Sequence, residues 1–234
     1  GNIGGSYVNN IDYITIATTG NATDFGDLTL ARYYSAGCSS GTRGIFGGGQ
    51  TSQSVNNIDY ITIASPGNAT DFGNLTLAKR GSSCSSSTRG LFGGGFLFDN
   101  TATDVIDYIT IATTGNATDF GNLIATVASN VACSSATRGI FAGGLYRNTI
   151  EYVTIATTGN ATSFGTLSQG RATAAGCSDG SRGIVAGGYN YPSHTNSIDY
   201  ITIATTGNAT DFGDLTSGKS DIAGLASTTR GVIA

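Results

Sequence analysis

The residues of this chain best suited to metal or nucleophilic chemistry are four cysteines and one histidine. The cysteines follow one another at intervals of 46, 49 and 44 residues, without the Cys-x2-Cys pair of a zinc site. Disulfides are the alternative for an even count, but equivalent positions of separate repeats lie too far apart for them. We therefore expect free buried thiols, no metal, no cofactor, and His194 as a loop residue. The cysteines are Cys38, Cys84, Cys133 and Cys177.

Residues for acid–base or nucleophilic catalysis form no constellation. Carboxylates are spread over equivalent positions of an internal repeat, and no serine nucleophile motif or phosphate loop is present. An arginine also recurs once per repeat, and five copies favour structural pairing with an aspartate such as Asp24 or Asp59 over an anion-binding ring. We expect a protein that is not an enzyme. The recurring arginines are Arg43, Arg89, Arg138, Arg182 and Arg230.

Aromatic and polar side chains gather in the segments that differ most between repeats. Tyr, Asn and Arg are common in recognition surfaces, because flat rings give contact area at low entropy cost. Rings beside Asn and Asp also suit the C–H faces and hydroxyls of sugars. Each ring alone could instead cover a sheet edge as a satellite core, so the set as a whole predicts a ligand-binding face. Its members are Tyr7, Tyr33, Phe96, Phe98, Tyr146, Arg147, Tyr189, Tyr191 and His194.

These segments are positioned by a unit that occurs five times. A period in the forties indicates one supersecondary unit per repeat, so residues 1–234 are expected to form a single repeat domain. Ile-Asp-Tyr or Ile-Glu-Tyr begins at Ile11, Ile58, Ile106, Ile150 and Ile198, in steps of 47, 48, 44 and 48 residues.

Each repeat predicts four short antiparallel strands, which is the make-up of a propeller blade. In the second repeat the expected strands cover residues 34–39, 45–48 and 58–63, with an outer strand centred on 69–72. Small side chains in the innermost strand are expected because five such strands converge on one axis. One phenylalanine per outer strand is expected to fill the gap between blades: Phe25, Phe72, Phe120, Phe164 and Phe212.

The repeat keeps its phase across the two ends of the chain. From Arg43 to Ile58 is 15 residues, and from Arg230 through Ala234 and on from Gly1 to Ile11 is also 15. An open solenoid needs atypical capping repeats, which this sequence lacks. The phase match predicts an all-β, closed five-bladed β-propeller whose last blade combines strands from both termini.

The residues of one repeat resemble those of kelch-type propellers. A glycine doublet such as Gly48-Gly49 ends the second strand, one aromatic marks the outer strand, and a basic residue precedes the inner strand. The chain departs from kelch in having Phe for the outer Trp, Ile-Ala for a Tyr-Asp pair as at Ile16-Ala17, and an arginine before every second strand. The basic residues assigned to the pattern are Arg32, Arg80, Arg171 and Lys219.

The repeated Ile-Ala-Thr-Thr-Gly-Asn-Ala-Thr-Asp-Phe-Gly segment is also similar to repeats in structural or appendage proteins of marine bacteriophages. That resemblance implies a virion or extracellular setting. Asn-Ala-Thr is a formal glycosylation acceptor, but without a secretory signal we expect a turn-forming role for each asparagine. These asparagines are Asn21, Asn68, Asn116, Asn160 and Asn208.

The near-identical turns are expected on one face of the ring and the variable loops on the other, where function usually resides. Charged residues make up 11% of the chain and the net charge is −4, which argues against nucleic acid. No apolar run approaches a membrane span. The absence of Met indicates a processed product or a piece of a longer protein. The expected function is recognition of a glycan or other surface ligand by a monomeric domain; the alternative is a structural module that docks against other virion or appendage proteins.

Overall fold

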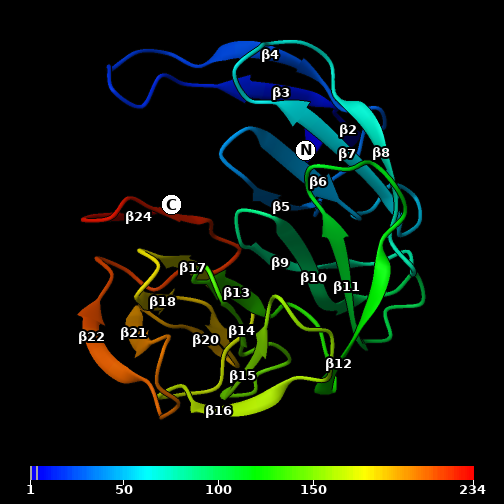
Figure 1. The fold of residues 1–234 in the computed structure, drawn as a ribbon. Coiled ribbons are helices and arrows are strands. Elements are labelled where there is room, and N and C mark those ends of the chain that lie inside the picture. The colour runs from blue at the N-terminus through cyan, green and yellow to red at the C-terminus, as the bar shows by residue number, and fades with distance from the viewer. Residues whose placement is uncertain (1, 4) are drawn as a thin grey trace.

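The structure is a computed structural model that describes residues 2, 3 and 5–234 of the chain. The described residues are all-β and form several antiparallel sheets without a helix. The sheets follow one another in chain order around a common centre (Figure 1). The described part of the chain has no helix with the length and apolarity of a membrane span.

Four sheets have four strands each, paired in the order inner, second, third and outer. The first contains β5 (Ala36–Ser39), β6 (Arg43–Gly47), β7 (Asn57–Thr62) and β8 (Thr70–Asn74). The second contains β9 (Arg80–Ser85), β10 (Arg89–Phe96), β11 (Thr103–Thr110) and β12 (Thr118–Val127). The third contains β13 (Val131–Ser134), β14 (Arg138–Ala142), β15 (Thr149–Thr154) and β16 (Thr162–Thr166). The fourth contains β17 (Ala175–Ser178), β18 (Arg182–Ala186), β21 (Ser197–Thr202) and β22 (Thr210–Asp214).

Two half-sheets flank this series. The N-terminal half-sheet pairs a third-type strand, β3 (Asn10–Tyr13), with an outer strand, β4 (Thr23–Asp27). The C-terminal half-sheet pairs an inner strand, β23 (Gly224–Ala226), with a second strand, β24 (Gly231–Ile233). Two short hairpins complete the set: β1 (Asn2–Ile3) with β2 (Ser6–Tyr7), and β19 (Tyr189–Asn190) with β20 (Ser193–His194). The predicted four-strand repeat is thus confirmed, with strand ends shifted by one or two residues.

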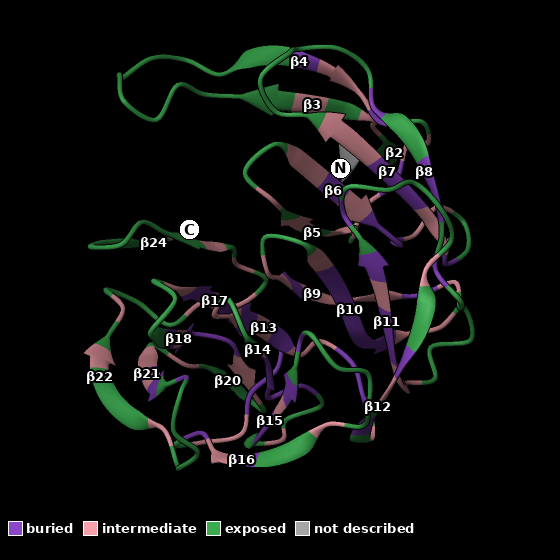
Figure 2. Cartoon of the chain, viewed as in Figure 1, coloured by how far each residue is buried: buried purple, intermediate pink, exposed green. Residues whose placement is uncertain are grey.

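The hydrophobic core lies between neighbouring sheets. Each of three buried clusters combines the phenylalanine of one outer strand with isoleucines or valines of the next sheet. In the first sheet, Ile58 and Asp59 point to opposite faces of β7 and both are fully buried, because a neighbour covers each face. The buried residues concentrate in the second and third strands of the four-stranded sheets, as in β10 and β11 (Figure 2).

The Thr-Gly-Asn-Ala-Thr turn joins each sheet to the one before it. The Gly115 N–H donates to the Phe72 carbonyl at 2.8 Å, and the Asn116 side-chain oxygen accepts from the Asn74 N–H at 3.0 Å. The same pair of bonds recurs at Gly67-Asn68, Gly159-Asn160 and Gly207-Asn208. The asparagine is therefore part of the contact between sheets as well as of its own turn.

Three of the recurring arginines, Arg43, Arg89 and Arg138, also join sheets, and for these three the predicted pairing with aspartate is wrong. The Arg43 guanidinium lies 4.5 Å from the Tyr60 ring centre and donates to the Ile111 carbonyl of the next sheet at 2.9 Å. Arg89 and Arg138 repeat this arrangement with Ile155 and Ile203. The register of β6 on β7 places Arg43 beside Thr62, while Asp59 lies further along β7 and binds a different cation.

That cation is the basic residue before the inner strand. Arg32 pairs with Asp59 at 3.0 Å, Lys79 with Asp107 at 3.0 Å, and Arg171 with Asp199 at 2.9 Å. All six side chains are almost completely buried. The sequence pattern assigned Arg80 to this position in the second sheet; the structure corrects the assignment to Lys79.

The third sheet lacks this ion pair. Val127 occupies the place of the base, and Glu151 replaces the aspartate. The Glu151 carboxylate accepts from the Ile124 N–H at 2.7 Å, and desolvation by burial raises its pKa, opposed by that hydrogen bond and by Arg147. A raised pKa means that the ionised form of Glu151 costs stability in the folded state.

Glu151→Gln is therefore expected to stabilise the protein at neutral pH. Glutamine can still accept from the Ile124 N–H but carries no charge to desolvate. Below the pKa that Glu151 has in the unfolded chain, its carboxyl is uncharged in both the folded and the unfolded wild type. The wild type and the variant should then be equally stable. As pH rises through the folded pKa, the wild type loses stability relative to the variant. Urea unfolding at about pH 4 and about pH 7 measures this difference; a difference that does not grow with pH contradicts the assignment.

The four cysteines are free, as predicted. Their thiols pack against glycines of the next sheet: a Cβ on Gly139 would lie 2.9 Å from the Cys84 sulfur. Burial raises the pKa of the Cys38 and Cys133 thiols to about 12. These cysteines act as small apolar contacts between sheets.

One junction differs from the others. No hydrogen-bonded ladder joins β24 to β3 among the described residues, and both strands keep a free edge. Phe212, the outer phenylalanine next to this junction, is 56% exposed, whereas Phe72, Phe120 and Phe164 are at most 4% exposed. The predicted filling of the gap thus holds at the other junctions and not at Phe212. We call β3, β24, Phe212 and their flanking turns the open junction.

Candidate ligand-binding site

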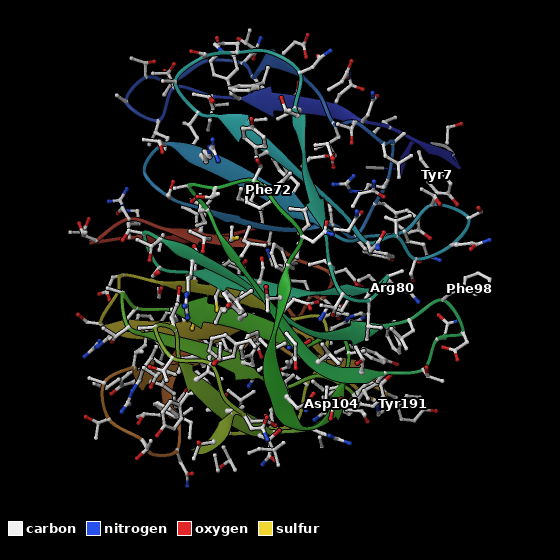
Figure 3. All side chains as sticks on the ribbon, turned by 45° about the vertical axis from the view of Figure 1, so that its right-hand side comes forward. Tyr7, Phe72, Arg80, Phe98, Asp104 and Tyr191 are labelled. Carbon is white, nitrogen blue, oxygen red and sulfur yellow. The ribbon has the colours of Figure 1, made fainter. Side chains whose placement is uncertain are left out.

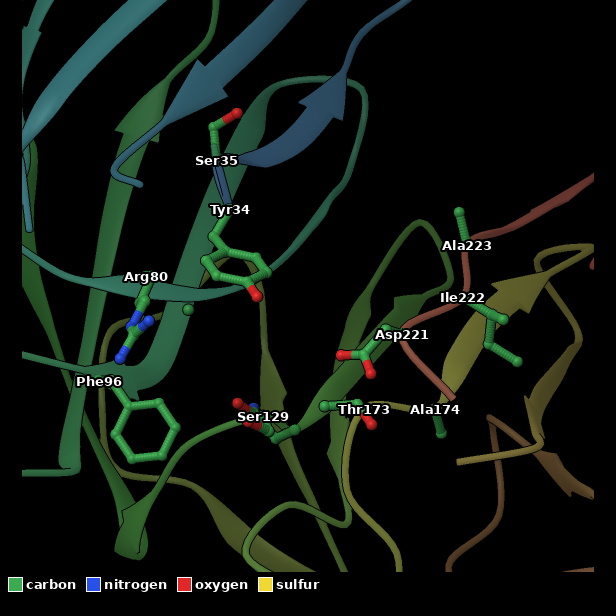
Figure 4. A pocket seen from close by; sticks show the side chains of 12 residues that line it. Tyr34, Ser35, Arg80, Phe96, Ser129, Thr173, Ala174, Asp221, Ile222 and Ala223 are labelled. Carbon is green, nitrogen blue, oxygen red and sulfur yellow. The ribbon is translucent and has the colours of Figure 1, made fainter. Parts of the chain in front are cut away.

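A pocket of about 570 Å³ lies where the chain enters the five inner strands. This volume falls within the roughly 300–1,000 Å³ of small-molecule sites. Each inner strand contributes the residues at its start, so the pocket lies on the central axis of the series of sheets (Figure 4). The side chains that differ between repeats here are Tyr34, Arg80, Ser129, Thr173 and Asp221.

The backbone holds four of these residues in one unusual conformation. Tyr34, Ser129, Thr173 and Asp221 have φ between 54° and 57°, in the left-handed region that favours glycine. Successive turns are bonded to each other, since the Thr173 N–H donates to the Ser129 carbonyl and the Asp221 N–H to the Thr173 carbonyl. The scaffold therefore fixes the backbone at this position while the side chain varies, and strain of this kind is often kept at functional sites.

Arg80 forms one wall of the pocket. Its guanidinium donates to the Gln50 side-chain oxygen at 2.6 Å and to the Asn100 side-chain oxygen. It lies 5.0 Å from the centre of the Phe96 ring and 5.6 Å from that of Tyr34. Two aromatic faces and two amides thus hold the guanidinium in place.

Polar groups occupy the opposite side. The Asp221 carboxylate lies across the pocket from Arg80 (Figure 4) and accepts from the Ser220 hydroxyl at 3.1 Å. Ser129 and Thr173 add hydroxyls that can donate or accept. Asn130 donates to the Ser82 hydroxyl at 2.8 Å, while its buried side-chain oxygen has no partner among the described residues.

The first aromatic cluster adjoins the Arg80 wall. Tyr7 stacks on Tyr33 with ring centres 5.3 Å apart and planes 9° apart. Tyr33 in turn lies 4.5 Å from Tyr34, which lines the pocket and is exposed. Three residues from two segments distant in sequence therefore form one continuous aromatic surface.

The second aromatic cluster surrounds the β19–β20 hairpin. Tyr189 meets Tyr146 at 5.9 Å, Tyr191 at 6.4 Å and His194 at 5.1 Å between ring centres. The His194 ring nitrogen Nδ1 lies 3.1 Å from the Ser220 hydroxyl, next to Asp221. His194 is exposed and lies in strand β20 of this hairpin, whereas the sequence predicted a loop residue.

Six of the nine sequence-predicted residues fall into these two clusters, and Phe96 lies against Arg80 in the pocket wall. The other two lie elsewhere. Phe98 is exposed at the tip of the loop after β10, beyond Phe96, and Arg147 lies near Glu151. Tyr7, Arg80, Phe98 and Tyr191 lie along the same side of the molecule (Figure 3). The sequence did not single out Tyr34, Ser129, Thr173 or Asp221. In the sequence these residues share only their place in the repeat: each lies four residues before the cysteine, or before Leu225 in the fifth repeat, and its side-chain type differs from repeat to repeat.

The arrangement is suited to binding. It offers one cation, one carboxylate, hydroxyls and aromatic faces around a pocket, which together can hold a polar ligand with apolar faces. Within the described part of the chain, no three or more His, Cys, Asp or Glu side chains are placed to hold a metal ion. A search with protein-family models found no match to this chain, and a search of curated proteins found no significant relative.

Proposed function

We propose that this protein is a non-enzymatic recognition module that binds a glycan through the face carrying the variable loops. The observation that carries the proposal is the axial pocket, where five equivalent positions bear five different side chains on a repeating scaffold. Variation of side chains at equivalent positions of a common scaffold is the expected pattern of a binding surface. The kelch-like and phage-like resemblances support a setting within a larger virion or extracellular protein.

A glycan fits the chemistry of this face. Exposed Tyr34 and Tyr191 offer flat rings to sugar C–H faces, and Asp221, Ser129 and Thr173 offer partners for hydroxyls. Tyrosine supplies both an apolar face and a polar edge.

A glycan-array screen of the isolated domain tests the proposal. We expect a specific hit that free sugar competes and that Tyr34→Ala or the double change Tyr189→Ala and Tyr191→Ala reduces at least tenfold, while the protein melts normally. Thr114→Ala, in an exposed turn on the opposite, uniform side, serves as the control and should bind unchanged. A blank array on folded protein, or a hit that none of these tyrosine changes weakens, overturns the proposal.

The second candidate is a structural or assembly module, and the open junction favours it. Ile16 is 94% exposed and Val232 51% exposed beside free strand edges. Such edges can pair with another chain. Native mass spectrometry at micromolar concentration separates the two: stable oligomers support assembly, and a persistent monomer supports the recognition module.

The proposal includes closure of the ring as a five-bladed propeller, with β24 pairing with β3 as β6 pairs with β7. By repeat equivalence, Val232 would then face Tyr13 as Ile45 faces Tyr60. The exposed isoleucines support this step. Ile111, Ile155 and Ile203 are at most 2% exposed where an arginine of the preceding sheet binds their carbonyls, whereas Ile16 and Ile63 are the exposed equivalents. Closure would bring Arg182 to Ile16 and Arg230 to Ile63.

Charge complementarity gives further support to closure. The base before β23 is Lys219, and the acid of β3 is Asp12, the equivalents of Lys79 and Asp107. Asp12 is exposed in the structure and Lys219 is half-buried. Pairing β24 with β3 would place these two side chains in the same sheet, as a fourth ion pair of the kind formed by Arg32, Lys79 and Arg171.

A further inference from the structure

The charge of Arg80 is not compensated by a carboxylate. Its two hydrogen-bond partners, Gln50 and Asn100, are neutral amides. No carboxylate of the described residues lies within ion-pair distance of Arg80, whereas the inner-strand bases Arg32, Lys79 and Arg171 each have one. Arg80 is also the only cation among the residues that line the pocket.

The guanidinium is fixed and still has donors to offer. Two of its five N–H groups are used by the amides, which hold the two terminal nitrogens. The Phe96 and Tyr34 rings lie beside it and limit its movement. A planar, positioned guanidinium with free N–H groups is the preferred partner of a carboxylate or sulfate.

We infer that the axial pocket selects an acidic saccharide, with the carboxylate or sulfate of the sugar on Arg80 and its hydroxyls on Asp221. This inference rests on the proposed function, because it specifies the class of glycan. Asp221, across the pocket, would repel a small anion but can accept hydrogen bonds from sugar hydroxyls. The two charges therefore orient a ligand that is acidic at one end and hydroxylated at the other.

The test compares acidic probes with their neutral esters. Galacturonic acid trimer and 3′-sialyllactose, each beside its methyl ester, are titrated into the full chain by calorimetry. At least one acid is expected to bind about tenfold to a hundredfold more tightly than its ester, as charge-assisted hydrogen bonds imply. Arg80→Gln should reduce the ratio of acid to ester affinity to about one. Asp221→Asn should weaken the ester, and it should raise the ratio of acid to ester affinity because it also removes the repulsion of the acid's carboxylate.

Arg182→Gln is the charge-matched control, since Arg182 stacks on Tyr200 away from the pocket. This variant should keep the ratio of the wild type, and thermal melting confirms that each variant is folded. Three results would each overturn the inference. They are equal binding of acid and ester, a ratio of acid to ester affinity that Arg80→Gln leaves unchanged, and no binding of either acid. In each of these cases a tyrosine-dependent hit with a neutral glycan would leave the proposed function standing.

Discussion

Replacing Gly121 by alanine is expected to lower the free energy of unfolding by roughly 2–4 kcal/mol. Gly121 has φ of +139°, a conformation open almost only to glycine. An added Cβ would lie 2.6 Å from the backbone carbonyl group of Gly159, in the turn of the next sheet. Because backbone cannot move aside as a flexible side chain can, the two sheets must separate. Urea unfolding measures the loss.

Two further glycines make this experiment a test of ring closure. Gly41→Ala is the control for added bulk, since Gly41 lies in an exposed turn with no atom near its Cβ position; a change within about 0.5 kcal/mol is expected. Gly213 has nearly the same backbone conformation as Gly121, with φ of +133°, but no neighbour within 4 Å in the structure. In a closed ring, Gly20 would lie against Gly213 as Gly159 lies against Gly121. We therefore expect Gly213→Ala to cost as much as Gly121→Ala. If Gly213→Ala lowers the free energy of unfolding clearly less than Gly121→Ala does, only backbone strain is acting at Gly213, and this result contradicts closure.

Asp107→Asn is expected to destabilise the protein by about 3–5 kcal/mol, because it leaves the buried Lys79 without its counter-charge. Lys79 is 1% exposed, and its ammonium also donates to the Phe92 and Val105 carbonyls, which hold it in place. Asparagine keeps the shape of the side chain and can still accept from Thr76, so the substitution isolates the charge. Asp71→Asn, on the exposed outer strand β8, is the control and should change stability by no more than about 0.5 kcal/mol.

The pH dependence of the Asp107→Asn variant identifies Lys79 as the cause. Desolvation lowers the pKa of Lys79, and Asp107 is the largest influence that raises it. Without Asp107 the folded pKa falls further below that of the unfolded chain. The unfolded state then binds more protons between these two pKa values, so the variant gains stability relative to the wild type as pH rises. Unfolding at about pH 7 and about pH 10 should show a shrinking deficit. A constant deficit would assign the loss to shape instead of charge.

Much of the fold could be predicted because the five copies of the repeat can be compared with one another, which shows the positions that all copies share. Ile58 and its equivalents, the glycine turns and the small inner strands fix the order and approximate ends of the strands. The side-chain pairings could not be predicted in the same way. Lys79 and Arg80 are adjacent, and only the direction of the chain entering β9 determines that Lys79 meets Asp107 while Arg80 faces the pocket. Arg43 lies beside a tyrosine and not an aspartate because of the register of β6 on β7.

The site was predictable in part for a similar reason. The aromatic residues around Tyr189 and Tyr33 stand out by type, and the structure brings them into two clusters. The pocket does not stand out, because Tyr34, Ser129, Thr173 and Asp221 share a backbone conformation and no chemistry. A left-handed φ at a tyrosine or threonine has no sequence signature, since tertiary contacts impose it.

The bonded chain of turns around the pocket has a consequence for how such a protein can change. Each repeat delivers a single side chain to the axial position, on a backbone that Tyr, Ser, Thr and Asp all adopt. Exchange of one repeat for another would exchange those side chains, or reorder them around the axis, while keeping the turn contacts between sheets that the repeats share. New ligand preferences would then arise by shuffling repeats that already fold.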